Sequence, residues 1–203
     1  MSDSKKFRDW DDRYAASDYL FGTAPNDFLK TVAHQLAPNS QILCLADGEG
    51  RNGVYLAAQG HTVTAVDQSR VGLEKAKKLA QQKQVSVETI KADLAEYDLG
   101  VESWDCIVSI FFHIPSEVRA NIYPRIIAAL KPGGSLILES YTPNQLNHKT
   151  GGPPTSDLML TKDQLTQYFS EMNLEHLQEL EREVIEGTRH TGLASVVQLL
   201  ALR

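Results

Sequence analysis

The chain has 203 residues, of which 42% are hydrophobic, and its formal net charge at pH 7 is −6. This length and apolar content fit a single domain with a substantial core. The acidic balance argues against wide contact with nucleic-acid phosphates or anionic lipid, because such partners bind through basic patches. We therefore expect neither nucleic acid nor a membrane among the partners.

The chain begins with polar residues, and it lacks a run of about 18 apolar residues such as a membrane span requires. The first six residues also lack the apolar core of a signal peptide, so we expect a cytoplasmic location. Cys44 and Cys106 both fall within apolar, strand-like runs, where a free thiol usually packs as a small hydrophobe. We expect two core cysteines without a redox role, in a monomer or weak homodimer.

From residue 25 onward, the spacing of apolar residues predicts alternating helices and strands. Helices are predicted over 25–37, 51–59, 69–83, 116–130 and 161–172, and strands over 41–46, 61–66, 85–91, 104–111, 134–141, 176–186 and 194–202. Such alternation predicts right-handed βαβ units and a parallel sheet covered on both faces. Only residues 187–193 separate the last two strands, which is too short for a crossover and indicates an antiparallel hairpin.

The predicted fold class is therefore α/β, a Rossmann-like, seven-stranded, mostly parallel sheet with a C-terminal antiparallel hairpin and helices on both faces. Residues 1–203 are expected to form one domain, with residues 1–24 as an N-terminal cover segment. Residues 143–160 form a long irregular stretch. A connection of that length in a compact domain is often a functional lid, so this stretch is a candidate substrate loop.

A glycine-rich turn follows the first predicted strand and leads into a helix. A helix that starts there presents free backbone N–H groups and the positive end of its dipole, and Gly48 and Gly50 let a ligand approach the backbone. Asp67, at the end of the second strand, is placed to accept hydrogen bonds from both hydroxyls of a ribose. The alternative is that Asp67 caps the helix that begins near Ser69.

Two kinds of nucleotide cofactor fit this cradle. The spacing Gly48-x-Gly50-x-x-Gly53 matches the dinucleotide fingerprint, which keeps nicotinamide or flavin binding open. S-adenosylmethionine is favoured because the third strand ends at Asp93, a second carboxylate that could accept from an adenine amino group. The C-terminal hairpin also leaves no room for a second dinucleotide-binding half.

The run from Leu130 to Leu138 contains a proline-glycine turn before a core strand. With this run and the glycine turn, the sequence resembles a class I S-adenosylmethionine-dependent methyltransferase over nearly the whole chain. The run Trp10–Tyr14 and the run Tyr19–Asn26 resemble the cover segment of a small bacterial branch that includes the tellurite-resistance and thiopurine methyltransferases. The Gly50-Arg51-Asn52 turn also matches that branch. The resemblance implies S-adenosylmethionine as the cofactor.

By this resemblance, the cofactor-binding residues lie in the glycine turn and at the tips of the second and third strands. They are Asp47, Gly48, Gly50, Asp67, Gln68, Ser69, Asp93 and Leu94, with Arg51 and Asn52 orienting the turn. The predicted set also includes Phe111 and Phe112, at the end of the fourth strand, and Tyr19 and Phe21, which could close the pocket from the cover segment. The chain departs from the family pattern at two positions. Cys44 stands where members commonly have an acidic residue, and Ala46 stands where they have the first glycine.

The candidate catalytic residues are His113, Tyr141 and His190. Ligands of open α/β sheets lie beyond the carboxyl ends of the strands, which places His113 and Tyr141 near the transferable methyl group. Aromatic faces there favour a cationic methyl donor. His113 has a pKa suited to proton transfer, and the alternative is that it only hydrogen-bonds the backbone or the cofactor.

The loop 143–160 and the hairpin tip contain further polar residues. His148, Arg182, Arg189 and His190 could surround an anionic substrate, and the alternative is a solvated loop and hairpin. The histidines include no close-spaced ligand pair of the kind that zinc sites use, so we expect no metal.

These features predict a methyltransferase that acts on a small-molecule nucleophile, such as a thiol, an oxyanion or another heteroatom. The chain has no Asn/Asp-Pro-Pro-aromatic tetrapeptide after the fourth strand, which argues against methylation of nucleic-acid amino groups. Two alternatives stay open: a regulatory module that binds the cofactor without catalysis, and a nicotinamide-dependent oxidoreductase.

Overall fold

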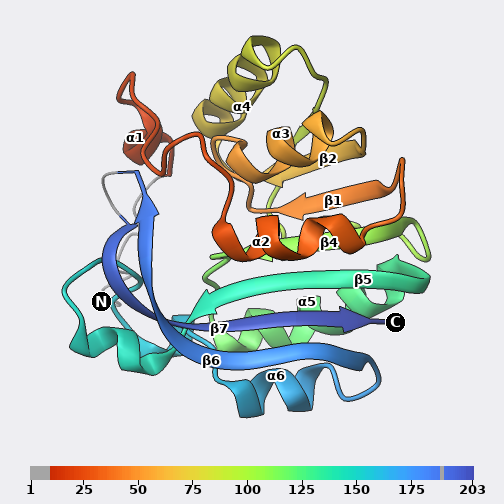
Figure 1. Cartoon of the computed structure of the whole chain (residues 1–203), viewed down its shortest axis with the longest axis vertical. Coiled ribbons are helices and arrows are strands. Elements are labelled where there is room, and N and C mark those ends of the chain that lie inside the picture. The colour runs from red at the N-terminus through yellow and green to blue at the C-terminus, as the bar shows by residue number, and fades with distance from the viewer. Residues whose placement is uncertain (1–9, 188–189) are drawn as a thin grey trace, which may run out of the picture.

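A seven-stranded sheet forms the centre of the computed structural model, which describes residues 10–187 and 190–203 (Figure 1). The strand order is β3-β2-β1-β4-β5-β7-β6. The strands are β1 (Gln41–Leu45), β2 (Thr62–Asp67), β3 (Glu88–Lys91), β4 (Trp104–Ile110), β5 (Leu130–Tyr141), β6 (Asn173–Glu186) and β7 (His190–Leu202). The strands from β1 to β5 run parallel, and β7 is antiparallel to both β5 and β6. The predicted fold class is confirmed.

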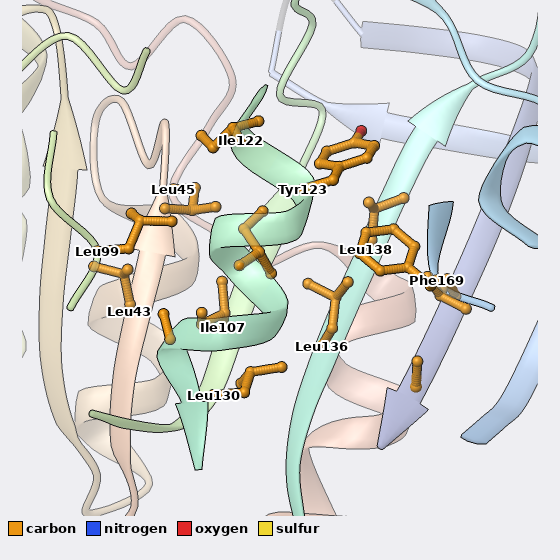
Figure 2. Packing of buried hydrophobic residues seen from close by; sticks show 14 of the residues in the cluster. Leu43, Leu45, Leu99, Ile107, Ile122, Tyr123, Leu130, Leu136, Leu138 and Phe169 are labelled. Carbon is orange, nitrogen blue, oxygen red and sulfur yellow. The ribbon is translucent and has the colours of Figure 1, made fainter. Parts of the chain in front are cut away.

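Helices cover both faces of the sheet because its strand residues alternate between two apolar clusters. The helices are α1 (Trp10–Tyr14), α2 (Asp27–Val32), α3 (Arg51–Ala58), α4 (Arg70–Gln82), α5 (Ser116–Ala129) and α6 (Lys162–Tyr168), with short 3-10 turns η1 (Ala33–Gln35), η2 (Pro143–Asn147) and η3 (Ser156–Leu158). In β1, Ile42 and Cys44 pack with α2 and α3, whereas Leu43 and Leu45 pack with α5. Figure 2 shows this second cluster around α5.

Both cysteines lie in the core. Cys44 and Cys106 are free thiols, and both belong to the apolar cluster beneath α2 and α3. Their predicted role as small core hydrophobes is confirmed. Of the helices that the structure describes, none combines the length and the apolar character needed to cross a bilayer.

The start of β5 differs from the prediction. The strand begins at Leu130, directly after α5, although the sequence predicted a start at residue 134. Leu130 pairs with Trp104, and the register then shifts before Cys106 pairs with Ser135. Gly133 has a left-handed φ of 77°, and its N–H donates to the carbonyl of Arg203. The proline-glycine segment is therefore an irregularity within a strand, where the sequence indicated a separate turn.

The C-terminal hairpin reaches further than predicted. Its connection is residues 187–189, because β6 continues to Glu186 and β7 already begins at His190. β7 pairs with β5 only from Val196 onward, whereas its residues 190–195 pair with β6 alone. We name residues 181–186 and 190–195 the hairpin ribbon. In Figure 1 this ribbon extends beyond the end of β5 toward α1.

The chain reverses its direction of strand addition between β1 and β4. From β1 the chain passes through α3 to β2 on one side, whereas β4 lies on the other side of β1. In open α/β sheets, ligands bind outside the carboxyl ends of the strands at such a switch point. The topology therefore places the turn after β1 and the residues after β4 at one site.

Candidate active site

The glycine turn between β1 and α3 has a backbone shape that most residues avoid. Ala46, Gly48 and Gly50 have left-handed φ values of 51°, 55° and 86°. A Cβ added to Gly48 would lie 2.5 Å from Tyr14 Oη, and one added to Gly50 would lie 2.5 Å from the Cβ of Ala76. Both glycines are therefore required by their neighbours. Ala46 adopts the left-handed conformation at the position where the family pattern has glycine.

Asp67 ends β2 beside this turn. Its Oδ2 accepts a hydrogen bond from the N–H of Gly48 at 2.9 Å, and its Oδ1 accepts one from the N–H of Ser69 at 2.7 Å. Burial raises the pKa of Asp67, although both backbone bonds oppose that rise. The N-cap of α4 is Ser69, whose Oγ accepts from the N–H of Gly72. Asp67 therefore connects the glycine turn to the start of α4 without capping the helix itself.

The tip of β3 lies next to the tip of β2 in the sheet. Asp93 is exposed, and its Oδ1 accepts a hydrogen bond from the N–H of Ala95 at 2.9 Å. Leu94 is buried and belongs to the core cluster around α5, whereas Gln68, after β2, is exposed. Of these three residues, Gln68 and Asp93 are therefore exposed to a ligand that binds from solvent, whereas Leu94 is not.

Three further predicted residues are held by protein partners. The carboxylate of Asp47 accepts from the N–H of Gly53 at 3.2 Å, and burial raises its pKa to about 7. Arg51 donates to Glu186 Oε2 at 2.6 Å, and Asn52 Oδ1 accepts from the N–H of Asn26 at 2.9 Å. These side chains shape the start of α3 and join it to other elements.

Glu49 fastens the cover segment to the glycine turn, and the sequence reasoning missed it. Its Oε2 accepts from the N–H of Leu20 at 2.8 Å, and its Oε1 pairs with Lys75 Nζ at 2.8 Å. Tyr19 donates from its hydroxyl to the carbonyl of Lys75 at 3.1 Å. An acidic residue between two glycines of a buried turn was the available signal, because a buried carboxylate needs partners.

Five rings from four parts of the chain form an aromatic cluster. Its members are Phe21, Phe111, His113, Tyr141 and His190. The ring centroids of Phe111 and Tyr141 are 4.7 Å apart, those of His113 and Tyr141 are 5.5 Å apart, and those of Phe21 and His190 are 4.6 Å apart. The structure thus brings together all three predicted catalytic residues.

The two phenylalanines after β4 have different surroundings. Phe111 has a left-handed φ of 53° and joins the aromatic cluster. Phe112 packs against the core cluster around α5. The positive φ of Phe111 turns the chain at the end of β4. Of the two phenylalanines, Phe111 therefore contacts the other predicted site residues, whereas Phe112 packs on the core.

His113 is held as a neutral side chain. Its Nδ1 lies 3.2 Å from the carbonyl oxygen of Leu158, which can only accept, so Nδ1 carries the proton. Burial is the main cause that lowers the pKa of His113 to about 3. Its Nε2 is buried and has no hydrogen-bond partner within residues 10–187 and 190–203. His113 therefore offers one buried acceptor at the aromatic cluster.

A buried network of charged side chains lies beside His190. Glu186 Oε2 is 3.7 Å from His190 Nδ1, and its Oε1 accepts from Asn26 Nδ2 at 2.9 Å. Arg182 Nη2 donates to Glu139 Oε1 at 2.5 Å. The sequence reasoning missed both glutamates, which contact residues more than 100 positions away in the chain.

The four residues proposed around an anionic substrate are not gathered in one place. Arg182 is paired with Glu139, and His148 Nε2 lies 3.1 Å from Glu181 Oε1. Arg189 lies outside the described residues, and only His190 joins the aromatic cluster. Within the described ranges, no three His, Cys, Asp or Glu side chains are grouped closely enough to share a metal ion.

The site fits S-adenosylmethionine in two respects. Gly48 and Gly50 are themselves buried, against Tyr14 and Ala76 respectively, so they fix the shape of the turn. Each Asp67 oxygen accepts one backbone N–H and retains a lone pair for a ribose hydroxyl. The aromatic cluster provides ring faces that favour a sulfonium.

Known proteins share this architecture. A family model described as a methyltransferase domain matches residues 42–134. The uncharacterized methyltransferase YodH of Bacillus subtilis (strain 168) is 32% identical over 132 residues, which cover 62% of this chain and 56% of YodH. The chain spans about half the length of the curated relatives it matches.

Two solved structures have the same fold. TehB from Haemophilus influenzae matches with a TM-score of 0.71 at 18% identity, covering 87% of this chain and 61% of TehB. The N-methyltransferase NodS from Bradyrhizobium japonicum WM9, in complex with S-adenosyl-L-homocysteine, matches with a TM-score of 0.69 at 14% identity, covering 96% of each chain.

The family model covers the glycine turn and the tips of β2, β3 and β4, which are the parts that fit an adenosine cofactor. The fold, the turn and these matches agree. In the matched segment, in the fold and in the residues of the cofactor cradle, the chain is similar to class I S-adenosylmethionine-dependent methyltransferases.

Proposed function

We propose that this protein transfers a methyl group from S-adenosylmethionine to a small-molecule nucleophile, such as a thiol, an oxyanion or another heteroatom. One observation carries the proposal. The aromatic cluster stands at the carboxyl ends of β4 and β5, beside the switch point where the glycine turn begins. A methyl donor held by the turn would have its reactive end near these rings.

The proposed cofactor contacts follow the strand tips. Gly48 and Gly50 would keep the glycine turn in its left-handed shape beside the cofactor, and Asp67 would accept from the ribose hydroxyls. Asp93 and Gln68 would face the adenine, since both are exposed at the tips of neighbouring strands. Asp47, Arg51, Asn52, Ser69 and Leu94 would act mainly by shaping these contacts, because their side chains are held within the protein.

The bound cofactor would supply an electrophilic methyl group. In-line displacement depends strongly on positioning, so the aromatic cluster would act by aligning the acceptor and excluding water. Ring faces of Phe111 and Tyr141 would favour the cationic donor. The neutral His113 would offer Nε2 as a hydrogen-bond acceptor to the second substrate.

The roof over the cluster supports a small acceptor. Phe21 of the cover segment contacts His190 of the hairpin ribbon, with the rings tilted and their centroids 4.6 Å apart. At the ribbon's turn, Gly187 packs against the backbone of Leu20 and Gly22. A polymer would have to enter beneath this contact, and the net charge of −6 would repel a nucleic acid.

The loop 143–160 is part of the proposal as a substrate loop. The carbonyl of Leu158 holds His113, and the N–H of Leu160 donates to the carbonyl of Tyr141 at 2.9 Å. Any movement of this loop would therefore displace two members of the aromatic cluster.

Calorimetry with S-adenosylmethionine, S-adenosylhomocysteine and NADH tests the cofactor part of the proposal. We expect saturable binding of the first two and none of NADH. Binding of NADH alone would support the oxidoreductase alternative and overturn the proposal.

Release of S-adenosylhomocysteine tests the catalytic part. The acceptors are 2-mercaptoethanol, catechol, ethanolamine and selenite, with bulk RNA as a comparator. We expect turnover with at least one small acceptor and none with RNA. Cofactor binding without turnover on any of them would favour a regulatory module, and turnover on RNA alone would overturn the small-molecule assignment.

A further inference from the structure

Glu186 is a buried carboxylate for which the cofactor site gives no direct use. Its side chain is 4% exposed, at the last position of β6. Oε2 accepts from Arg51 Nη2 at 2.6 Å and lies 3.7 Å from His190 Nδ1, while Oε1 accepts from Asn26 Nδ2 at 2.9 Å. Two elements distant in the sequence thus fix this carboxylate next to one histidine nitrogen.

Within the described residues, His190 Nδ1 is buried without a hydrogen-bond partner, and Glu186 Oε2 lies 3.7 Å from it, at ion-pair distance. The negative charge of the carboxylate at this nitrogen favours the neutral tautomer with its proton on Nδ1. The lone pair then remains on Nε2, in a ring that lies among Phe21, Phe111 and Tyr141. His190 therefore combines an ionised partner with a place in the aromatic cluster.

The charges that face His190 come from several elements. Burial lowers its pKa, Arg51 of α3 and Arg13 of α1 act in the same direction, and Glu186 opposes them. The neighbouring rings of His113 and Tyr141 are neutral near pH 7, since burial lowers the pKa of the histidine and raises that of the phenol. His190 is thus unprotonated near neutral pH but has a carboxylate that stabilises the protonated form.

His113 differs from His190 in this respect. Its Nδ1 faces the carbonyl of Leu158, which has no full charge, and its pKa is lowered to about 3. A histidine in that state can orient a substrate hydrogen but cannot hold a second proton near pH 7. The two histidines are therefore suited to different tasks.

We propose that Glu186 is a positioning residue that holds His190 with Nδ1 protonated, so that His190 Nε2 accepts the proton released by a protic methyl acceptor. The acceptor class is then a hydroxyl, thiol or amine that still carries its hydrogen when it binds, and not a preformed anion. This inference rests on the proposed function.

In the proposed step, the acceptor atom forms a bond to the methyl carbon, the carbon–sulfur bond breaks with its electron pair left on sulfur, and the acceptor hydrogen moves to His190 Nε2 as a proton. The imidazolium of His190 would be stabilised by Glu186 until the proton passes to solvent.

The first test is histidine NMR on the full chain with ¹⁵N-labelled side chains, assigned with His190→Gln. In the wild-type protein we expect the Nδ1–H tautomer of His190. In Glu186→Gln we expect its pKa to fall by about one unit or more, because an adjacent opposite charge is lost. The matched control is Glu181→Gln, which removes the carboxylate beside His148 and is expected to leave His190 unchanged.

The wild-type spectrum alone keeps this test decisive if Glu186→Gln fails to fold. An Nε2–H tautomer of His190 in the wild-type protein would overturn the proposal. An unchanged pKa and tautomer of His190 in a folded Glu186→Gln protein would overturn it as well.

The second test separates this inference from the proposed function. Calorimetry with S-adenosylhomocysteine should show binding in the wild-type protein and in His190→Gln; absence of binding in both would reject the proposed function. With catechol or 2-mercaptoethanol as acceptor, His190→Gln should lower kcat by about 100-fold or more, with KM nearly kept. In Glu186→Gln the rising limb of the pH–rate profile should move to lower pH. Full kcat of His190→Gln on a protic acceptor would overturn the inference.

Discussion

Single side chains at the glycine turn do several tasks at once. Asp67 accepts two backbone hydrogen bonds while it faces the proposed ribose position, and Glu49 ties both the cover segment and Lys75 to the turn. A substitution at either residue can therefore change both cofactor affinity and folding stability. Each variant needs a control in which a similar carboxylate is replaced away from the site.

Replacing Asp67 with alanine should weaken the binding of S-adenosylhomocysteine by about 1 to 3 kcal/mol, because a charged acceptor of ribose hydrogen bonds is lost. Isothermal calorimetry measures the change. Asp98→Ala is the control, since Asp98 also accepts a backbone N–H two residues ahead, at Gly100, but on an exposed turn. Unchanged affinity in Asp67→Ala would limit Asp67 to a structural role.

Glu49→Gln should lower the free energy of unfolding by about 3 kcal/mol, because the charge of Lys75 would remain buried without its ionic partner. Urea denaturation measures this loss. The exposed pair of Glu74 and Lys77 supplies the control, and Glu74→Gln should leave the midpoint unchanged. Equal stability of the two variants would contradict the importance of the buried pair.

The hairpin ribbon and the cover segment act as one element that roofs the aromatic cluster. They touch where Gly187 meets the backbone of Leu20 and Gly22, and where Phe21 meets His190. A side chain at residue 187 would separate the two backbones, so this contact depends on a residue without a Cβ.

Gly187→Ala should destabilise the roof more than backbone strain alone can explain. Gly187 has φ 65°, and an added Cβ would meet Leu20 O and would lie 2.6 Å from Gly22 N. Gly60→Ala is the control, because Gly60 has φ 93° and no atom within 4 Å of an added Cβ; it should cost about 1 kcal/mol. Acrylamide quenching of Trp10 fluorescence, measured in a Trp104→Phe background, should increase only in Gly187→Ala.

The sequence predicts which helices and strands exist better than it predicts where each strand begins and ends. Alternating positions such as Ile42 and Leu43 identify strands buried on both faces, because the period of two is a local property. The length of the ribbon depends on where β7 leaves β5, at Val196, and no local pattern encodes that partner change. The prediction therefore placed the start of β7 at residue 194, although it lies at His190.

The whole molecule buries several charges that only the assembled fold brings together. Glu139 accepts from Asn26, Arg182 and Gln198, so α2, β6 and β7 all meet β5 at one carboxylate. The sequence predicts the strand-tip residues because they follow motifs, such as Gly48 and Asp67. It could not predict Glu139 or Glu186, since each looks like an ordinary strand residue until distant partners are known.

Two buried groups should shape the pH dependence of folding in opposite directions. Burial raises the pKa of Asp47 to about 7, so its contribution is fully present below about pH 4 and is lost as the pH rises through 7. Burial lowers the pKa of His113 to about 3, so its contribution is lost as the pH falls below about 6.5.

Asp47→Asn should therefore make the protein more stable than the wild type at pH 8 and should flatten the decline between pH 5 and pH 8. Urea denaturation at a series of pH values measures both effects. Cys44→Ser, in the same buried region, is the control for polarity alone and should keep the wild-type slope. A parallel decline in Asp47→Asn would show that Asp47 ionises normally in the folded protein.

The position of β7 has a consequence for synthesis. This strand is made after every other element, yet it lies between β5 and β6 in the finished sheet. While the ribosome is still producing residues 190–202, β5 has an open edge and β6 has no neighbour to join. A nascent chain at that stage exposes unpaired backbone and apolar surface, which favours self-association until translation has passed β7.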